Sequence, residues 1–213
     1  MLCAKFARRT LRKDNAGKWI KLAIREKLLA KIDGPRVLEA YGGKGELGKA
    51  LYLLYPGAVF EKNEAKTSYL SEQRPMWAVY EGDCVKAMEA GIGFHHKPNF
   101  IDIDPYGTPW PALRAVFANA DVLPDRLGVV VNDGLRRFAM LGCAWKCEDL
   151  AEHVKRLGNS GVHKHWLAVV RELFDEVAGR AGFVVREWAI KSAGHGDQMT
   201  HYAAIVEREK APS

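Results

Sequence analysis

Short apolar runs alternate with stretches of helix-like spacing along most of the chain. Five of these runs are followed within a few residues by glycine or an acidic residue and predict strands, at 36–40, 58–60, 77–80, 99–103 and 127–131. Apolar residues at helical spacing predict helices at 19–32, 47–55, 66–72, 135–141, 147–157 and 165–178. Two final strands, at 183–190 and 201–206, are predicted to pair as an antiparallel hairpin.

Strands that alternate with helices favour a mostly parallel sheet that is covered on both faces. We therefore predict an α/β fold, a single-domain, Rossmann-like, doubly wound sheet of seven strands, mostly parallel, with a C-terminal antiparallel hairpin and helices on both faces. A chain of 213 residues is long enough for one such domain with a hydrophobic core. In sheets of this kind, ligands bind at the carboxyl ends of the strands.

Positive charge is concentrated near the N-terminus. The formal net charge is +6, and residues 1–31 hold ten Lys and Arg residues against Asp14 and Glu26. We interpret residues 1–18 as a basic N-terminal arm and residues 19–213 as the globular domain. Such a segment favours a polyanion, and we predict that it binds nucleic acid, RNA rather than DNA. A solvated basic end without a partner explains the charge alone equally well.

The composition predicts a cytoplasmic protein. No apolar run approaches the roughly 18 residues of a membrane span, and residues 1–10 lack the apolar stretch of a secretory signal. The four cysteines do not have the pattern of a disulfide scaffold. We therefore expect no membrane contact.

A glycine-rich turn follows the first predicted strand. Gly43, Gly45 and Gly48 match the G-x-G-x-x-G dinucleotide fingerprint. Glu61 ends the next strand, where a carboxylate can accept both hydroxyls of a ribose. The pattern fits NAD, and it equally fits S-adenosylmethionine (SAM), whose amino-acid part needs a close approach to the backbone.

Three further acidic positions extend this pattern. Glu39 precedes the glycines, Asp83 follows the third strand, and the fourth strand runs into Asp104-Pro105-Tyr106-Gly107-Thr108-Pro109. In order and spacing, these motifs resemble those of class I SAM-dependent methyltransferases. The last segment is most similar to the Asp-Pro-Phe-Gly-Ser-Pro segment of tRNA guanosine N2-methyltransferases. It is also related to the Asp-Pro-Pro-Tyr motif of DNA adenine and cytosine amino methyltransferases. The chain is much shorter than the tRNA enzymes, and we expect no counterpart of their additional C-terminal domain.

The resemblance implies that residues 19–213 form a methyltransferase domain with SAM as its cofactor and no metal ion. It implies cofactor contacts at Glu39, Tyr41, Gly42, Gly43, Gly45, Glu61, Lys62, Asp83, Cys84 and Asp104. It implies catalytic positions at Asp104, Pro105, Tyr106 and Gly107. A zinc site formed by Cys143, Cys147 and nearby histidines is a weaker alternative, because a second paired-ligand module is missing.

The Asp104 segment suits methyl transfer to a nucleobase amine. An exocyclic amine is a poor nucleophile because its lone pair is delocalised into the ring, and acceptors for both of its hydrogens favour the pyramidal geometry needed for attack. The Asp104 carboxylate and the Pro105 carbonyl can be those acceptors, and Tyr106 can stack on the base. In the alternative interpretation, the segment is a tight turn with Tyr106 in the core.

We therefore predict an N-methyltransferase for an exocyclic amino group of a nucleobase, with guanine N2 in RNA as the first choice. Adenine or cytosine amino groups in DNA are the nearest alternative, followed by a protein or small-molecule substrate. An NAD-dependent dehydrogenase and a non-catalytic nucleic-acid-binding module are the alternatives from other classes. A partner subunit can supply target recognition in the first case.

Overall fold

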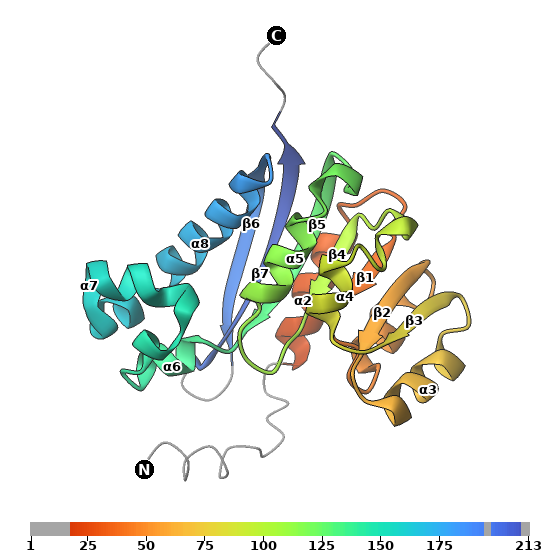
Figure 1. The fold of residues 1–213 in the computed structure, drawn as a ribbon, viewed down its shortest axis with the longest axis horizontal. Helices are drawn as coiled ribbons and strands as arrows, with labels where there is room; N and C mark the ends of the chain where they lie inside the picture. The colour runs from red at the N-terminus through yellow and green to blue at the C-terminus, as the bar shows by residue number, and fades with distance from the viewer. Residues whose placement is uncertain (1–17, 194–196, 210–213) are drawn as a thin grey trace.

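The computed structural model describes residues 18–193 and 197–209 (Figure 1). All of the basic arm predicted at 1–18 except Lys18 lies outside these residues, so binding of nucleic acid by the arm stays a prediction. None of the helices in the described ranges combines the length and the apolar character that a membrane span requires.

A single mixed sheet of seven strands forms the centre of the molecule. Its strands are β1 (Val37–Glu39), β2 (Gly57–Glu61), β3 (Trp77–Glu81), β4 (Phe100–Ile103), β5 (Arg126–Asp133), β6 (Phe183–Ala193) and β7 (Met199–Arg208). They lie in the order β3-β2-β1-β4-β5-β7-β6. The first five strands in this order are parallel, whereas β7 pairs antiparallel with both β5 and β6. The predicted sheet and its terminal hairpin are confirmed.

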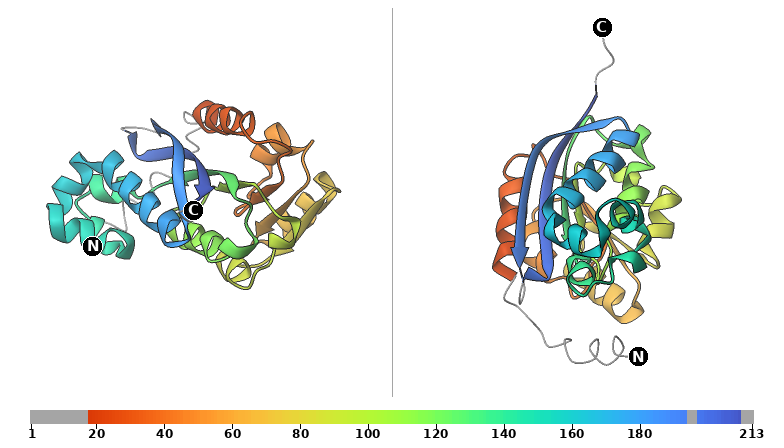
Figure 2. Two further views of the ribbon diagram at one scale, coloured as in Figure 1. Left: turned by 90° about the horizontal axis from the view of Figure 1, so that it is seen from above. Right: turned by 90° about the vertical axis from the view of Figure 1, so that its left-hand side faces the viewer.

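Helices cover both faces of the sheet, as the view from above shows (Figure 2). On one face lie α2 (Lys18–Leu29), the π-helical turn η2 (Gly48–Tyr52) and α3 (Glu64–Gln73). On the other lie α4 (Cys84–Glu89), α5 (Trp110–Phe117) and α8 (Trp166–Arg180), with α6 (Arg136–Met140) and α7 (Ala151–Lys164) beyond them near the β6 side. Short 3-10 turns complete the chain: η3 (Phe94–His96), η4 (Ala120–Val122), η5 (Ala144–Lys146) and η6 (Glu148–Leu150).

The helices differ from the sequence prediction in ways that have physical reasons. The helix expected at 47–55 is helical at 46–52, the π-helical turn η2 included, and so stops three residues early. Helix α4 has six residues, too few for an apolar period, and it begins where Asp83 accepts hydrogen bonds from the backbone of Val85 and Lys86. Helix α5 is buried over most of its length, so it has no polar face to mark it. Helix α7 is interrupted at Gly158, whose φ of 69° and ψ of 167° are not helical, so its first segment stops at the predicted end at 157 and a second helical segment follows.

Candidate active site

The glycine loop is held by the carboxylate at the end of β2. Gly43 has a φ of 54° and Gly45 one of 72°, backbone conformations that favour glycine. The Gly43 N–H donates to Glu61 Oε2 at 2.7 Å, and the N–H of Asn63 donates to Oε1 at 3.0 Å. Each carboxylate oxygen of Glu61 therefore keeps acceptor capacity beside the loop.

Gly48 makes room for an arginine that the sequence motifs did not reveal. A Cβ at Gly48 would lie 1.7 Å from Nη2 of Arg74. The Arg74 guanidinium donates to Glu39 Oε2 at 2.5 Å and lies over the ring of Trp77. Both side chains of this ion pair are 2% exposed. Burial raises the pKa of Glu39 to about 7, although the charge of Arg74 opposes the shift. Glu39 thus anchors Arg74 beneath the loop.

The end of β3 carries the other predicted cofactor residues. Asp83 accepts from the N–H groups of Val85 and Lys86 at 3.0 and 3.3 Å, and both bonds reach the same oxygen, Oδ1. The Cys84 thiol is buried and is hydrogen-bonded to the hydroxyl of Tyr41, and burial raises the pKa of both groups.

Lys62, beside Glu61, is exposed. Gly42 lies in the loop, where a Cβ would meet the side chains of Val59 and Leu70 at 2.6 and 2.7 Å. Close packing therefore requires glycine at this position. The cofactor contacts predicted for Lys62 and Gly42 stay predictions.

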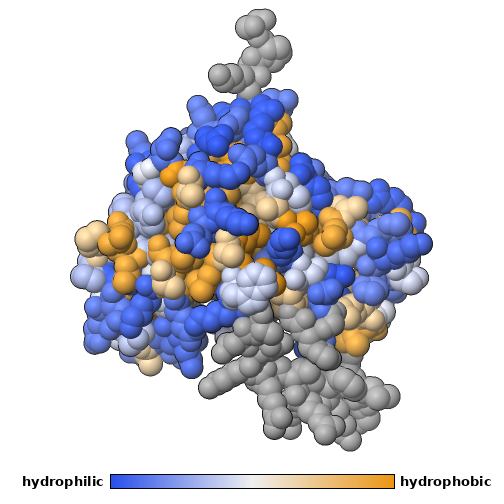
Figure 3. Space-filling model, turned by 180° about the vertical axis from the view of Figure 1, so that it is seen from behind, coloured by the Kyte–Doolittle hydropathy of each residue, from blue (hydrophilic) through white to orange (hydrophobic). Residues whose placement is uncertain are grey.

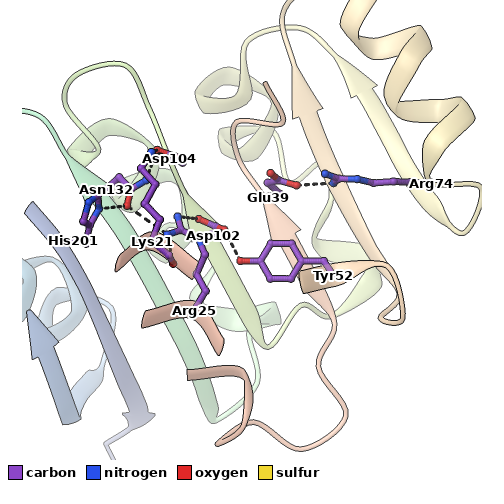
Figure 4. A network of polar contacts seen from close by, with 9 residues as sticks. All are labelled: Lys21, Arg25, Glu39, Tyr52, Arg74, Asp102, Asp104, Asn132 and His201. Atoms are coloured by element: carbon purple, nitrogen blue, oxygen red, sulfur yellow. Dashed lines mark hydrogen bonds and ion pairs between the residues drawn. The ribbon is translucent and has the colours of Figure 1, made fainter. Parts of the chain in front are cut away.

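The Asp104 carboxylate lies at the carboxyl end of β4 with two donors on it (Figure 4). Lys21 Nζ donates to Oδ1 at 3.0 Å and to Oδ2 at 3.1 Å, and the Asn132 amide donates to Oδ1. Burial alone would raise the pKa of Asp104, but the charges of Arg25 and Lys21 and the hydrogen bond from Asn132 outweigh it and hold the pKa below its usual value. Asp104 is therefore a carboxylate at neutral pH.

The remainder of the predicted catalytic segment is a turn with an exposed aromatic tip. Tyr106 is fully exposed and Pro105 is buried. Gly107 has a φ of 144°, and its carbonyl accepts from the N–H of Gly134 at 3.1 Å. The alternative in which Tyr106 lies in the core is therefore wrong.

A second ion pair lies directly below Asp104. Arg25 is fully buried and donates to Asp102 from Nε at 2.7 Å and from Nη2 at 2.6 Å. The hydroxyl of Tyr52 donates to Asp102 Oδ2 at 2.5 Å. Such a bidentate pair with a further hydrogen bond satisfies both buried charges.

His201 determines which way the Asn132 amide points. Its Nδ1 lies 2.5 Å from Asn132 Oδ1, and Nη1 of Arg25 donates to the same oxygen at 3.5 Å. Because Oδ1 can only accept, Nδ1 must carry the proton, and the Asn132 NH2 is turned toward Asp104. Burial lowers the pKa of His201 to about 4, so the ring is neutral. The network of Figure 4 therefore presents donors to Asp104.

Part of the described basic segment is used inside the fold. Lys21 and Arg25 form buried or half-buried ion pairs with Asp104 and Asp102, whereas Lys18 and Lys31 pair with Glu46 and Glu187 at the surface. The charges of Lys21 and Arg25 therefore have a structural role. Of these groups only Asp104 was singled out from the sequence; its partner Lys21 and the residues Arg74, Asn132 and His201 were not.

Similarity to known proteins is found in the structure of this chain and not in its sequence. No protein-family model and no curated protein sequence matches the chain. Solved structures do match. Trm1 from Pyrococcus horikoshii, in complex with S-adenosyl-L-methionine, matches this chain with a TM-score of 0.62 at 13% sequence identity. The match covers 90% of this chain and 56% of Trm1. TYW2 from M. jannaschii, in complex with AdoMet, matches with a TM-score of 0.56 at 13% sequence identity. This match covers 88% of this chain and 76% of TYW2.

NodS, an N-methyltransferase from Bradyrhizobium japonicum WM9 in complex with S-adenosyl-L-homocysteine, matches with a TM-score of 0.59 at 9% sequence identity. This match covers 93% of this chain and 91% of NodS. This chain has the class I methyltransferase fold. It spans about half the length of Trm1, 56%, and most of the length of NodS. The methyltransferase fold, expected from the motif series, is thus confirmed by structures of low sequence identity.

Proposed function

We propose that this protein is a SAM-dependent N-methyltransferase that acts on an exocyclic amino group of a nucleobase, with guanine N2 in RNA as the favoured target. The observation that carries the proposal is an anionic Asp104, kept charged by its neighbours, directly beside the exposed ring of Tyr106 on a methyltransferase fold. The resemblance of residues 104–109 to the Asp-Pro-Phe-Gly-Ser-Pro segment of tRNA guanosine N2-methyltransferases supports RNA as the substrate class.

The residues around the glycine loop fit SAM. The Glu61 carboxylate retains acceptor capacity for two ribose hydroxyls, and Oδ2 of Asp83 remains for an amino group because both capping bonds reach Oδ1. A Cβ at Gly43 would meet no atom within 4 Å, so the loop is open on that side. When bound, SAM supplies a methyl group on a positively charged sulfur.

The chain's own residues would orient and activate the target amine. Asp104 Oδ2 accepts only from Lys21 among the described residues, so it retains a lone pair for an N–H of the target. Tyr106 stacks on the base and aligns the nitrogen with the methyl group. SAM held beside this turn would supply the methyl group to the nitrogen lone pair, and Asp104 or water would take up the proton that the nitrogen loses. Orientation and electrostatics supply the catalysis.

Calorimetric titration with SAM, S-adenosylhomocysteine and NAD tests the cofactor. We expect the first two to bind and NAD not to bind. Transfer of tritiated methyl groups is then measured on tRNA, ribosomal RNA and DNA, for the wild type and Asp104→Asn. The variant should lose about 10²–10⁴-fold in kcat while its affinity for SAM stays within a few-fold. Binding of NAD alone, or full activity of Asp104→Asn, would refute the proposal.

A further inference from the structure

The segment between β5 and α7 is attached to the catalytic turn at both ends. At its start, the N–H of Gly134 donates to the carbonyl of Gly107 at 3.1 Å. At its end, Asp149 accepts from the hydroxyl of Thr108 at 3.1 Å and pairs with Arg114 at 2.6 Å. Residues 136–146, which comprise α6 and η5, therefore lie between two points that are attached to the turn and to its neighbour α5, after the carboxyl end of β5 (Figure 1).

Residues 136–146 expose an unusual amount of apolar surface. Phe138, Met140, Leu141 and Trp145 are 42%, 37%, 53% and 61% exposed. The backbone below them is fixed, since the N–H of Cys143 donates to the Phe138 carbonyl at 2.8 Å and the N–H of Trp145 donates to Asn159 Oδ1 at 3.1 Å. Ala139 and Ala144 are buried. An ordered apolar surface of this kind next to a catalytic turn marks a binding site.

The other face of the molecule also shows apolar groups between hydrophilic ones (Figure 3). There, Leu53 and Leu54 are exposed just after η2. What distinguishes residues 136–146 is the combination of aromatic rings with cations. Residues 136–147 contain no acidic residue, Arg136 donates to the hydroxyl of Ser192, and Lys146 Nζ lies 5.3 Å from the centre of the Trp145 ring. Unpaired nucleotides are bound by this combination, since their bases stack on aromatic rings and their phosphates attract positive charge.

We propose that residues 136–146 form a stacking platform for the unpaired nucleotides that flank the target base. This proposal rests on the proposed function and adds the surface that recognises the substrate. Tyr106 contacts the target base, while Phe138 and Trp145 stack on its neighbours and Lys146 contacts the phosphate backbone. Because stacking is tolerant of sequence, the platform selects single-stranded or looped RNA over duplex.

The test is the binding of a labelled single-stranded RNA of roughly 12 nucleotides, a length in the range bound by such surfaces. In the full chain, Trp145→Ala and Phe138→Ala should each weaken binding about tenfold, equivalent to about 1.4 kcal/mol. Trp145→Phe should restore most of the affinity, because it restores a ring. Met76→Ala is the matched control, since Met76 is 65% exposed and lies just before β3, at the opposite edge of the sheet. It should bind like the wild type.

Calorimetry with SAM shows for each variant that the fold and cofactor site are intact. If the wild type binds and methylates RNA while the alanine variants match it in affinity, the platform is wrong and the proposed function stands. If the wild type does not bind this RNA and methylates only another kind of substrate, both proposals are wrong. A drop in molar mass by light scattering for Trp145→Ala, with unchanged RNA affinity, would assign the surface to contact between copies of this chain and overturn the platform.

Discussion

Gly48→Ala is the sharpest test of how the glycine loop is built. The added Cβ would lie 1.7 Å from Nη2 and 2.0 Å from Cζ of Arg74, so the guanidinium must leave its position. That guanidinium is the buried partner of Glu39, at 2.5 Å. Breaking a buried ion pair costs about 3–5 kcal/mol, and we expect about 3 kcal/mol because the freed arginine can reach water and Glu39 can take up a proton.

A double-mutant cycle separates this cause from others. Urea unfolding followed by tryptophan fluorescence gives the free energy of unfolding for Gly48→Ala, Arg74→Ala and the double variant. Arg74→Ala should cost about 3 kcal/mol by leaving Glu39 unpaired, and the double variant should cost no more, since the Cβ then has room. The coupling energy is therefore about −3 kcal/mol.

Gly179→Ala provides the control for the substitution itself. Gly179 lies in α8, and a Cβ there would meet no atom within 4 Å, so this variant should be neutral or slightly stabilising. Additive losses in the cycle would refute the account of Gly48 as room for Arg74. The same conclusion would follow if Gly48→Ala kept its stability and lost only SAM affinity, because the glycine would then serve the cofactor directly.

Two further variants test the charged groups. Lys21→Met removes a cation 3.0 Å from Asp104 that lowers the pKa of that carboxyl, so the pKa should rise and the acid limb of the kcat/KM profile should move to higher pH while the plateau is unchanged. Lys27→Met, exposed on the same helix, is the control, and an unmoved limb would contradict the assignment. Asp133 is buried and its pKa is raised to about 7, so the folded state binds this proton more tightly and stability is lost as pH rises from about 4 to 7. Asp133→Asn should therefore raise the free energy of unfolding, measured with urea, by up to about 4 kcal/mol at pH 8 and by less at pH 5.5. An equal increase at the two pH values would show that the Asp133 carboxyl does not titrate in this range.

The parallel sheet and its acidic strand ends were predictable because both are local signals. A short apolar run followed by an acid or glycine marks where a buried strand reaches the surface, and Glu61 and Asp104 lie where that pattern predicts. Helix α8 was predictable for the same reason, because its buried side chains recur at helical spacing.

The partners of the strand acids were not predictable from spacing. Lys21 and Arg25 precede Asp104 and Asp102 by about eighty residues in the sequence, and only the packing of α2 brings them together. One signal was present: Asp102 lies between Ile101 and Ile103 in a fully buried strand, and a buried carboxylate requires a cation or a donor. The sequence indicates the need for such a partner but not which residue meets it.

Helix and strand geometry explain why this pair of cations fits this pair of acids. Lys21 and Arg25 are one helical turn apart, about 6 Å along α2, and Asp102 and Asp104 are two residues apart, about 6.6 Å along the extended chain. Because Lys21 contacts the acid nearer the carboxyl end, α2 runs antiparallel to β4 and places one cation on each acid. The fully buried lower pair fixes the register of α2, and this register positions Lys21 on Asp104. A substitution at Arg25 should therefore disturb the Asp104 carboxylate without contacting it.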